Sequence, residues 1–386
     1  MDFLNKFKLI AILRDKNTSY QKLVEFLFGE APPPDHNFLA RIDKPLVAEV
    51  IKSNCYDRVL RNEIIFSVVI PTYNGGERLS DALNSVLNQK GVNKAGVEII
   101  VVDDGSEDDT AKTAKNFIKQ HPGEKMCFIR SLSNHGPSYA RNLGIKQARG
   151  TFVCFTDDDC VVPENWLCNF KLVFEKNPEI GGAGGLYHTE DKQKRLNKFH
   201  NWMFRVIPQN KTASFNDLSN LCGNTANICY RKSVLESCGG FNHFFRFPSL
   251  EDIELKIRVQ KMGFSILHMP DLVRHKKSHS LAMFIKGSIY RGWARYLMYK
   301  LHPDYISLSF SSLFPTSLLT RHSLKYLFNE KLTRNISAID KFFFSFFIIL
   351  RGLCYGLGKY LTTLEIGEQL GSKKMADRNS RIFYKS

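Results

Sequence analysis

Residues 97–110 read Val-Glu-Ile-Ile-Val-Val-Asp-Asp-Gly-Ser-Glu-Asp-Asp-Thr, and this stretch decides the fold. Its first six residues are mostly β-branched and apolar, which predicts a buried strand over 97–102. The acidic turn that follows leads directly into residues 108–120, whose pattern predicts a helix. A buried strand that passes through a polar turn into a helix is the building unit of α/β proteins.

The same alternation continues on both sides of this stretch. The predicted strands lie at 64–70, 126–130 and 151–155, and the predicted helices at 77–89, 137–148 and 163–176. This order predicts a parallel sheet with right-handed crossovers. After residue 180 the pattern becomes α+β, with strands expected at 181–186, 224–230 and 264–269 and helices at 232–238 and 251–262. We therefore predict an α/β fold.

Three regions are expected along the chain. Residues 1–60 look helical, contain no motif and are interrupted by three prolines at 32–34, so we interpret them as a helical N-terminal extension. Residues 61–280 hold the alternating elements and form the expected main domain. Residues 281–386 are basic, aromatic and helical in pattern, which predicts a helical C-terminal region.

The net charge of +16 over 386 residues is unevenly spread. Residues 61–270 carry 26 basic and 23 acidic side chains, whereas residues 271–386 carry 19 and 7. The nearly balanced middle argues against a polyanionic partner for the main domain, and we expect no nucleic-acid binding, because no recognition motif accompanies the basic tail. A polytopic membrane protein is excluded, because no run of 18 apolar residues occurs.

Cysteine usage and the N-terminus predict a cytoplasmic protein. The nine cysteines are odd in number and form no Cys-x-x-Cys pair, so neither a disulfide framework nor a zinc module is indicated. The short apolar stretch at residues 7–13 ends at Arg14 and Asp15 without a small-residue cleavage site, so we do not interpret it as a signal peptide.

Acidic residues follow two of the predicted strands. Ligands of open α/β sheets bind outside the carboxyl ends of the strands, where Asp103-Asp104 and Asp157-Asp158-Asp159 converge. Three adjacent carboxylates repel one another and favour a hard divalent cation, which commonly shares its shell with substrate phosphates. The alternative is a solvated acidic turn. Asp103 and Asp104 would bind a nucleobase or ribose, or would cap the following helix.

Two further candidates lie later in the chain. Glu251-Asp252 opens a predicted helix, where a carboxylate either complements the helix dipole or acts as a general base. His275 trails the last predicted strand, where it would complete a metal shell or serve a structural role.

These residues belong to a longer series that resembles glycosyltransferase family 2 with the GT-A fold. The series spans about 64–280 and contains Val68–Asn74, Ile99–Ser106, Asn134–Gly144, Asp157–Cys160 with Trp166, Gly239–Phe241, Glu251-Asp252 with Arg258, and His275. The resemblance implies a Rossmann-like nucleotide-sugar-binding domain with a mixed central sheet. It also implies an inverting, metal-dependent transfer of a sugar from a nucleotide-diphosphate donor, UDP- or GDP-linked, to a glycan or lipid-linked acceptor in cell-surface glycan or glycolipid synthesis.

The resemblance also implies roles for individual residues. Asp252 would be the catalytic base, and Glu251 would help to bind the acceptor. The nucleotide sugar would be bound by Pro71, Tyr73, Glu77, Asp104, Arg141, Asp157 and Asp158. Mn²⁺ or Mg²⁺ would be held by Asp159 and His275. Because the triplet permits a shift of one residue, Asp158 would alternatively take the ribose or the metal role.

Departures from the family pattern refine these expectations. Leu250 stands where glycine is common, which puts the acceptor pocket in question. The Gln-x-x-Arg-Trp motif of processive synthases is absent, which favours addition of a single sugar. Two alternatives remain: a degenerate GT-A domain that binds a glycan or nucleotide at a membrane, and a nucleotidyltransferase.

The C-terminal region predicts a membrane contact. Residues 341–358 are apolar and aromatic but are interrupted by Arg351, which suits a helix lying in the membrane interface. We therefore expect a peripheral position on the inner face of the cell membrane. The alternative is a helix packed on the catalytic domain.

Overall fold

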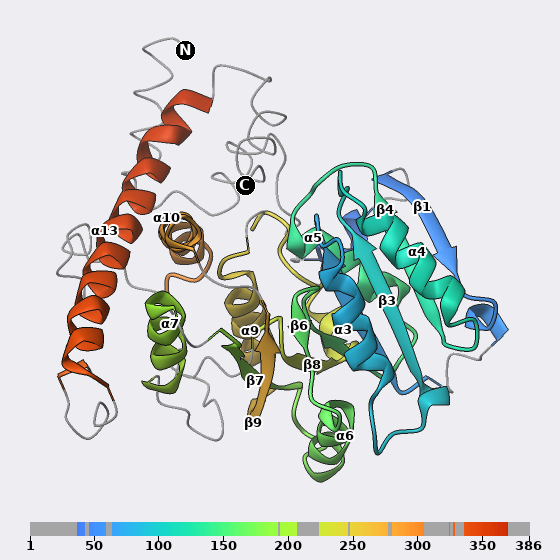
Figure 1. Cartoon of the computed structure of the whole chain (residues 1–386). Coiled ribbons are helices and arrows are strands. Elements are labelled where there is room, and N and C mark those ends of the chain that lie inside the picture. Colours follow the sequence, from blue (N-terminus) through green and yellow to red (C-terminus); the bar gives the residue numbers. More distant parts are fainter. Residues whose placement is uncertain are drawn as a thin grey trace. The chain divides into compact units, whose positions relative to one another are not determined.

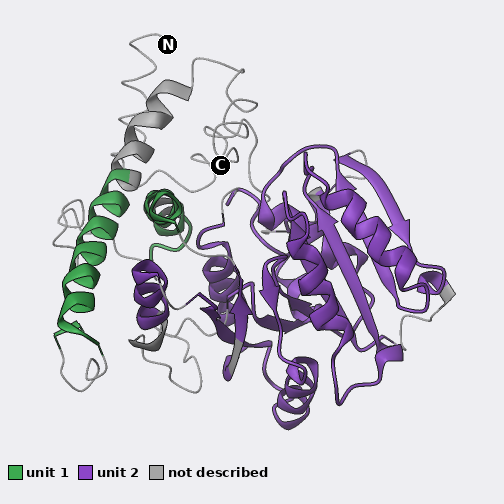
Figure 2. Ribbon diagram, viewed as in Figure 1, with its two compact units in different colours: residues 1–34, 279–386 green, residues 35–278 purple. Residues whose placement is uncertain are grey.

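The computed structural model describes residues 37–42, 46–58, 64–191, 194–206, 224–245, 248–276, 280–304, 324, 327–328 and 336–369. The chain divides into two compact units (Figure 2), residues 35–278 and residues 1–34 with 279–386. The described helices of the second unit are α10 (Leu281–Leu301) and α13 (Ala338–Gln369).

A nine-stranded sheet forms the centre of unit 35–278 (Figure 1), in the order β1-β4-β3-β2-β5-β8-β7-β9-β6. The strands are β1 (Val47–Lys52), β2 (Phe66–Thr72), β3 (Val97–Asp103), β4 (Met126–Ser131), β5 (Phe152–Phe155), β6 (Cys160–Val161), β7 (Gly182–Thr189), β8 (Ile228–Arg231) and β9 (Ile266–His275). β4, β3, β2 and β5 run parallel, whereas β1, β8 and β6 pair antiparallel with their neighbours. The expected α/β class with a mixed central sheet is confirmed.

Helices cover both faces of the sheet because alternate residues of each strand point to opposite faces. Val68 and Ile70 join one core cluster with α3 (Arg78–Leu87), α4 (Thr110–Gln120) and α6 (Trp166–Lys176). Val69 joins the other cluster with α5 (Pro137–Gln147), α8 (Lys232–Ser237) and α9 (Glu251–Lys261). α7 (Arg195–Val206) follows β7. The packing of the strands between the two helical layers therefore fixes the position of the polar residues at the carboxyl ends of the strands.

Part of the helical expectation for residues 1–60 is wrong. Residues 47–52 form the edge strand β1, which pairs antiparallel with β4. The sequence Val-Ala-Glu-Val-Ile-Lys is rich in β-branched residues, and its side chains alternate between half-buried and exposed, as on an edge strand. Residues 1–36, including the proline run, lie outside the described residues.

In the second unit, α10 and α13 pack against each other through apolar side chains. The rings of Phe284 on α10 and Phe347 on α13 meet edge to face, with their centroids 5.9 Å apart. Residues 341–358 thus lie within one long helix, as their pattern predicts. Among the helices that the structure describes, none combines the length and the apolar character needed to cross a membrane.

Candidate active site

The three carboxylates at 157–159 follow β5 and contact three different elements. The contacts are Asp157 Oδ1 to Arg141 Nη2 at 3.1 Å, Asp158 Oδ2 to Thr72 Oγ1 at 2.6 Å, and Asp159 Oδ1 to His275 Nε2 at 3.4 Å. The alternative of a solvated acidic turn does not describe Asp158 and Asp159, which are less than a tenth exposed, whereas the Asp157 side chain is 30% exposed. Each carboxylate is therefore held in a fixed direction.

Asp158 is anchored to the end of β2. It accepts a hydrogen bond from the Thr72 hydroxyl, and the Arg78 Nη2 atom lies 4.0 Å from its Oδ2 atom. Burial, followed by the charge of Asp159, raises its pKa from the ordinary 3.8 to about 7. Gly75 permits this contact, because a Cβ atom there would lie 2.3 Å from Thr72 Oγ1 and 2.4 Å from Asp158 Oδ2.

Arg141 on α5 joins the acidic triplet to the start of α9. Its Nη2 atom contacts Asp157, and its Nη1 atom lies 3.0 Å from Glu251 Oε1. The Arg141 and Glu251 side chains are both buried, at 4% and 5% exposure. Burial and then the charge of Asp252 raise the pKa of Glu251 to about 7, although Arg141 opposes the shift.

Asp252 is the more accessible carboxylate of the pair. Its side chain is 19% exposed, and its Oδ2 atom lies 3.8 Å from Lys256 Nζ, one turn along α9. The preceding Leu250 adopts φ = +66°, a left-handed conformation that favours glycine. The glycine that the family resemblance leads us to expect here would adopt this conformation freely, whereas Leu250 adopts it under strain.

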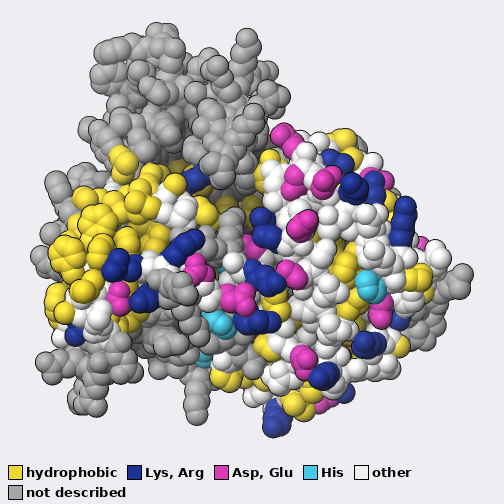
Figure 3. All heavy atoms as spheres, viewed as in Figure 1, with side chains coloured by type: hydrophobic (Ala, Val, Ile, Leu, Met, Phe, Trp, Pro, Cys, Tyr) yellow, Lys and Arg dark blue, Asp and Glu magenta, His cyan; other side chains and the backbone are white. Residues whose placement is uncertain are grey.

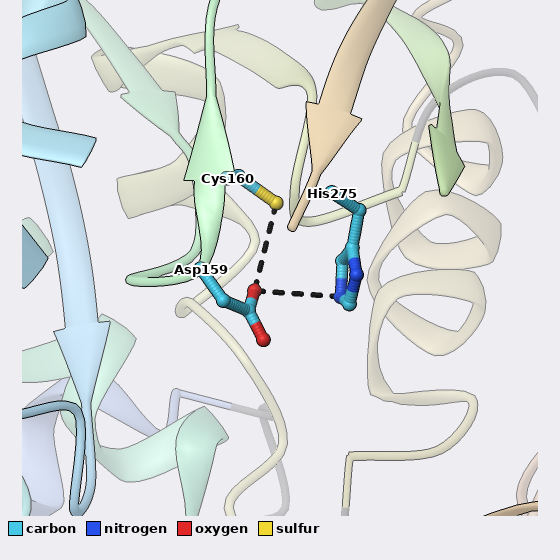
Figure 4. A group of neighbouring side chains, drawn as sticks. All are labelled: Asp159, Cys160 and His275. Carbon is cyan, nitrogen blue, oxygen red and sulfur yellow. Dashed lines mark hydrogen bonds and ion pairs between the residues drawn. The ribbon is translucent and has the colours of Figure 1, made fainter. Parts of the chain in front are cut away.

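Asp159, Cys160 and His275 offer one oxygen, one sulfur and one nitrogen that all lie within 4.8 Å of one another (Figure 4). The backbone places them together, because Cys160 on β6 pairs directly with His275 on β9. A carboxylate and an imidazole fit a divalent cation, so the donor set agrees with the expected metal role of Asp159 and His275. Tyr187 stacks on the His275 ring, with centroids 5.0 Å apart.

The expected nucleotide-binding residues lie at the ends of β2 and β3. Pro71 is buried, Tyr73 is half-buried and Glu77 is exposed at the N-cap of α3. Asp104 is buried and accepts hydrogen bonds from the backbone amides of His135 and Gly136, at the start of α5. Burial raises the pKa of Asp104 well above its ordinary value.

Asp103 and Asp104 both accept backbone hydrogen bonds, but neither caps the helix that follows them in the sequence. Asp104 serves the start of α5 and not the helix that follows it in sequence, and Asp103 accepts from the Ser106 amide. The amide of Thr110 in α4 donates to Asp108. The nucleotide role of Asp104 stays a prediction.

Three residues contact the triplet without having been assigned a role from the sequence. Thr72 and Arg78 lie beside Asp158, and Cys160 lies beside Asp159. Thr72 belongs to the family series, and Arg78 opens α3, whose N-terminus after a strand is a place where anions commonly bind. Cys160 carries no such signal, because its contact with His275 depends on strand pairing.

Residues 67–253 match the family model described as Glycosyl transferase family 2. Glycosyltransferase AglE of Haloferax volcanii is 27% identical over 213 residues, which cover 54% of this chain and 65% of AglE. The minor teichoic acid biosynthesis protein GgaA of Bacillus subtilis is 30% identical over 188 residues, covering 47% of this chain and 41% of GgaA.

Poly-beta-1,6-N-acetyl-D-glucosamine synthase of Staphylococcus epidermidis is 28% identical over 210 residues, covering 53% of this chain and 48% of the synthase. The chain thus spans less than two thirds of the length of these curated relatives. A solved mannosyltransferase of Pyrobaculum calidifontis, in complex with GDP-Man and Mn²⁺, has a TM-score of 0.48 at 17% identity, covering 98% of this chain and 93% of its own.

Proposed function

Because the chain belongs to glycosyl transferase family 2 through residues 67–253, we propose that it is an inverting, metal-dependent glycosyltransferase. One observation carries the proposal. Arg141 joins Asp157 of the acidic triplet to Glu251 at the start of α9, so the expected donor and acceptor carboxylates meet at one edge of the sheet. Buried charges with shifted pKa values that gather at one edge of a sheet are typical of functional sites.

The proposed donor is a UDP- or GDP-linked sugar. Pro71, Tyr73 and Asp104 lie at the carboxyl ends of adjacent parallel strands, where α/β sheets bind nucleotides. The names of the relatives in teichoic acid and poly-N-acetylglucosamine synthesis support a role in cell-surface glycan synthesis, with a glycan or lipid-linked acceptor.

In the proposed reaction, the acceptor oxygen forms a bond to the anomeric carbon as the bond to the diphosphate breaks. Asp252 takes the acceptor proton, and its partial exposure leaves it open to the acceptor. Arg141 positions Glu251 and Asp157. Arg78 lies beside Asp158 and is 40% exposed, so its positive charge would offset the charge of the leaving diphosphate. When bound, Mn²⁺ or Mg²⁺ at Asp159 and His275 supplies positive charge for that diphosphate.

The products test this reaction class. Purified chain is incubated with nucleotide sugars, a divalent cation and candidate acceptors, and the products are followed by NMR. We expect release of nucleoside diphosphate and a glycoside product in which the anomeric configuration of the transferred sugar is inverted. Release of inorganic pyrophosphate would instead identify a nucleotidyltransferase, and retained configuration would contradict the displacement at Asp252.

We also propose that α13 lies on the inner face of the cell membrane. Six exposed apolar residues recur along one side of α13, namely Ile339, Phe342, Phe346, Ile349, Leu353 and Leu357, each between 43% and 71% exposed. Figure 3 shows hydrophobic side chains gathered over this part of the surface. Residues 271–386 carry 19 basic and 7 acidic side chains, so the occupant that complements this apolar stripe is an anionic lipid surface.

A further inference from the structure

The candidate metal site differs from an all-oxygen site because it contains a thiol. The Sγ atom of Cys160 lies 3.7 Å from Asp159 Oδ1, and His275 Nε2 lies 3.4 Å from the same oxygen (Figure 4). The Cys160 side chain is fully buried, and its sulfur turns toward the other two donors.

Two of the three donor separations, those from the Asp159 oxygen to the nitrogen and to the sulfur, match a tetrahedral cation. With bond lengths of about 2.0–2.1 Å to nitrogen and oxygen and about 2.3 Å to sulfur, tetrahedral geometry places the nitrogen and oxygen about 3.3 Å apart. The sulfur and oxygen would then be about 3.6 Å apart. The observed 3.4 Å and 3.7 Å agree with both values. Three protein donors leave a fourth position open, which is the arrangement of a catalytic site.

The strand pairing holds this geometry in place. Cys160 and His275 are opposite residues of the antiparallel pair β6–β9, so their side chains leave the sheet on the same face. The Lys276 amide donates to the Asp159 carbonyl at 2.9 Å, which ties the third donor to the same ladder. The three donors are thus positioned by backbone hydrogen bonds.

We propose that Cys160 is a direct metal ligand and that the site binds Zn²⁺ in preference to Mg²⁺. Thiolate and imidazole donors select borderline cations such as Zn²⁺ and Co²⁺, whereas Mg²⁺ needs an octahedral shell of oxygens. On binding, the sulfur–metal bond replaces the sulfur–hydrogen bond, and one proton passes to the solvent. The role of the bound metal in catalysis rests on the proposed function. The metal binding itself does not, because it is measured without substrate.

Cobalt spectroscopy of the full chain tests the proposal. Co²⁺ is titrated into the metal-free protein, and a thiolate-to-cobalt charge-transfer band is expected to rise to one equivalent. The band should disappear in Cys160→Ser and persist in the control Cys168→Ser, whose cysteine lies on α6. Zn²⁺ affinity should fall at least about tenfold in Cys160→Ser, with Mg²⁺ affinity changed much less.

Saturation by Co²⁺ without the charge-transfer band, or equal Zn²⁺ affinity in the wild type and Cys160→Ser, would overturn the proposal. If Cys160→Ser does not fold, His275→Ala decides, since loss of a wild-type band in that variant ties the sulfur to this site and an unchanged band assigns it to another cysteine. A chain that shows the band but releases no nucleoside diphosphate retains this inference and loses the proposed function. A chain that releases nucleoside diphosphate but shows no band retains the proposed function and loses this inference.

Discussion

The Nη1 atom of Arg141 lies 3.0 Å from the Oε1 atom of Glu251, although 110 residues separate them in the sequence. Both side chains are at most 5% exposed, so Glu251 depends on Arg141 for charge compensation, and Arg141 is compensated by Glu251 and Asp157 together. The pair fixes the start of α9 against α5. Asp252, the proposed base, therefore depends on this buried pair for its position.

Breaking the pair should destabilise the fold. Arg141→Met removes the cation beside the buried Glu251 and beside Asp157. At pH 8, where Glu251 is ionised, we expect a loss of about 3–5 kcal/mol in the free energy of unfolding. The double variant Arg141→Met/Glu251→Gln should recover part of that loss, because it removes both charges. Denaturant unfolding of the wild type, both single variants and the double variant measures the coupling. Additive losses would show that the two side chains do not interact.

The pH dependence of stability follows from two raised pKa values. Burial raises the pKa of Asp158 and of Glu251 to about 7, above the ordinary 3.8 and 4.5. The folded state therefore binds more protons than the unfolded state between about pH 4 and 7, and stability falls as pH rises through this window. Metal-free protein should melt at a lower temperature at pH 8 than at pH 5.

Glu251→Gln isolates one part of this effect. The variant cannot ionise at residue 251, so its melting temperature should change less between pH 5 and pH 8 than that of the wild type. Asp57→Asn, a change at a largely exposed side chain paired with Lys52, is the matched control and should follow the wild-type profile. A Glu251→Gln profile as steep as the wild type would show that Glu251 does not carry the raised pKa.

Gly75→Ala should damage the site directly. The added Cβ atom would lie within 2.4 Å of both Thr72 Oγ1 and Asp158 Oδ2, which forces the hydrogen-bonded pair apart. We expect a loss of about 1–3 kcal/mol in stability together with weaker donor binding. Gly123→Ala is the control, because a Cβ atom there meets nothing within 4 Å. Equal behaviour of the two variants in calorimetry would contradict the close packing at Gly75.

The membrane contact is tested by charge within the apolar stripe. Phe342→Glu/Phe346→Glu places two carboxylates where the exposed rings would enter the lipid, so co-sedimentation with anionic phospholipid vesicles should fall by about tenfold or more. Leu132→Glu changes an equally exposed apolar residue of the other unit and should leave co-sedimentation unchanged. Undiminished binding of the α13 variant would refute the proposed surface.

The strands and the acidic strand ends could be predicted because both are local patterns. A buried apolar run followed by Asp103-Asp104 or by Asp157-Asp158-Asp159 indicates the carboxyl end of a strand in an α/β sheet. β1 could not be predicted with the same ease, because an edge strand of six residues carries a weak pattern. The contact of Arg141 with Glu251 could not be predicted, because it joins distant segments through the tertiary fold.

Two other features also depend on three-dimensional arrangement. The departure at Leu250 is visible in the sequence, but its physical meaning is the left-handed backbone with φ = +66°, which no local propensity of leucine indicates. Cys160 lies beside His275 only because β6 pairs with β9. Neither the backbone conformation of Leu250 nor the pairing of Cys160 with His275 can be inferred from a short stretch of sequence alone.

The central claim is that the carboxylates at this sheet edge transfer a sugar from a nucleotide donor. Its most direct test is the release of nucleoside diphosphate from a panel of UDP- and GDP-sugars with acceptor and divalent cation, measured for the wild type, Asp252→Asn, Asp159→Ala and the control Asp57→Asn. We predict turnover by the wild type and Asp57→Asn, a loss of about 10²–10⁴-fold in Asp252→Asn, and no metal-dependent turnover in Asp159→Ala. Full activity in Asp252→Asn or in Asp159→Ala, each with an intact fold, would contradict the claim.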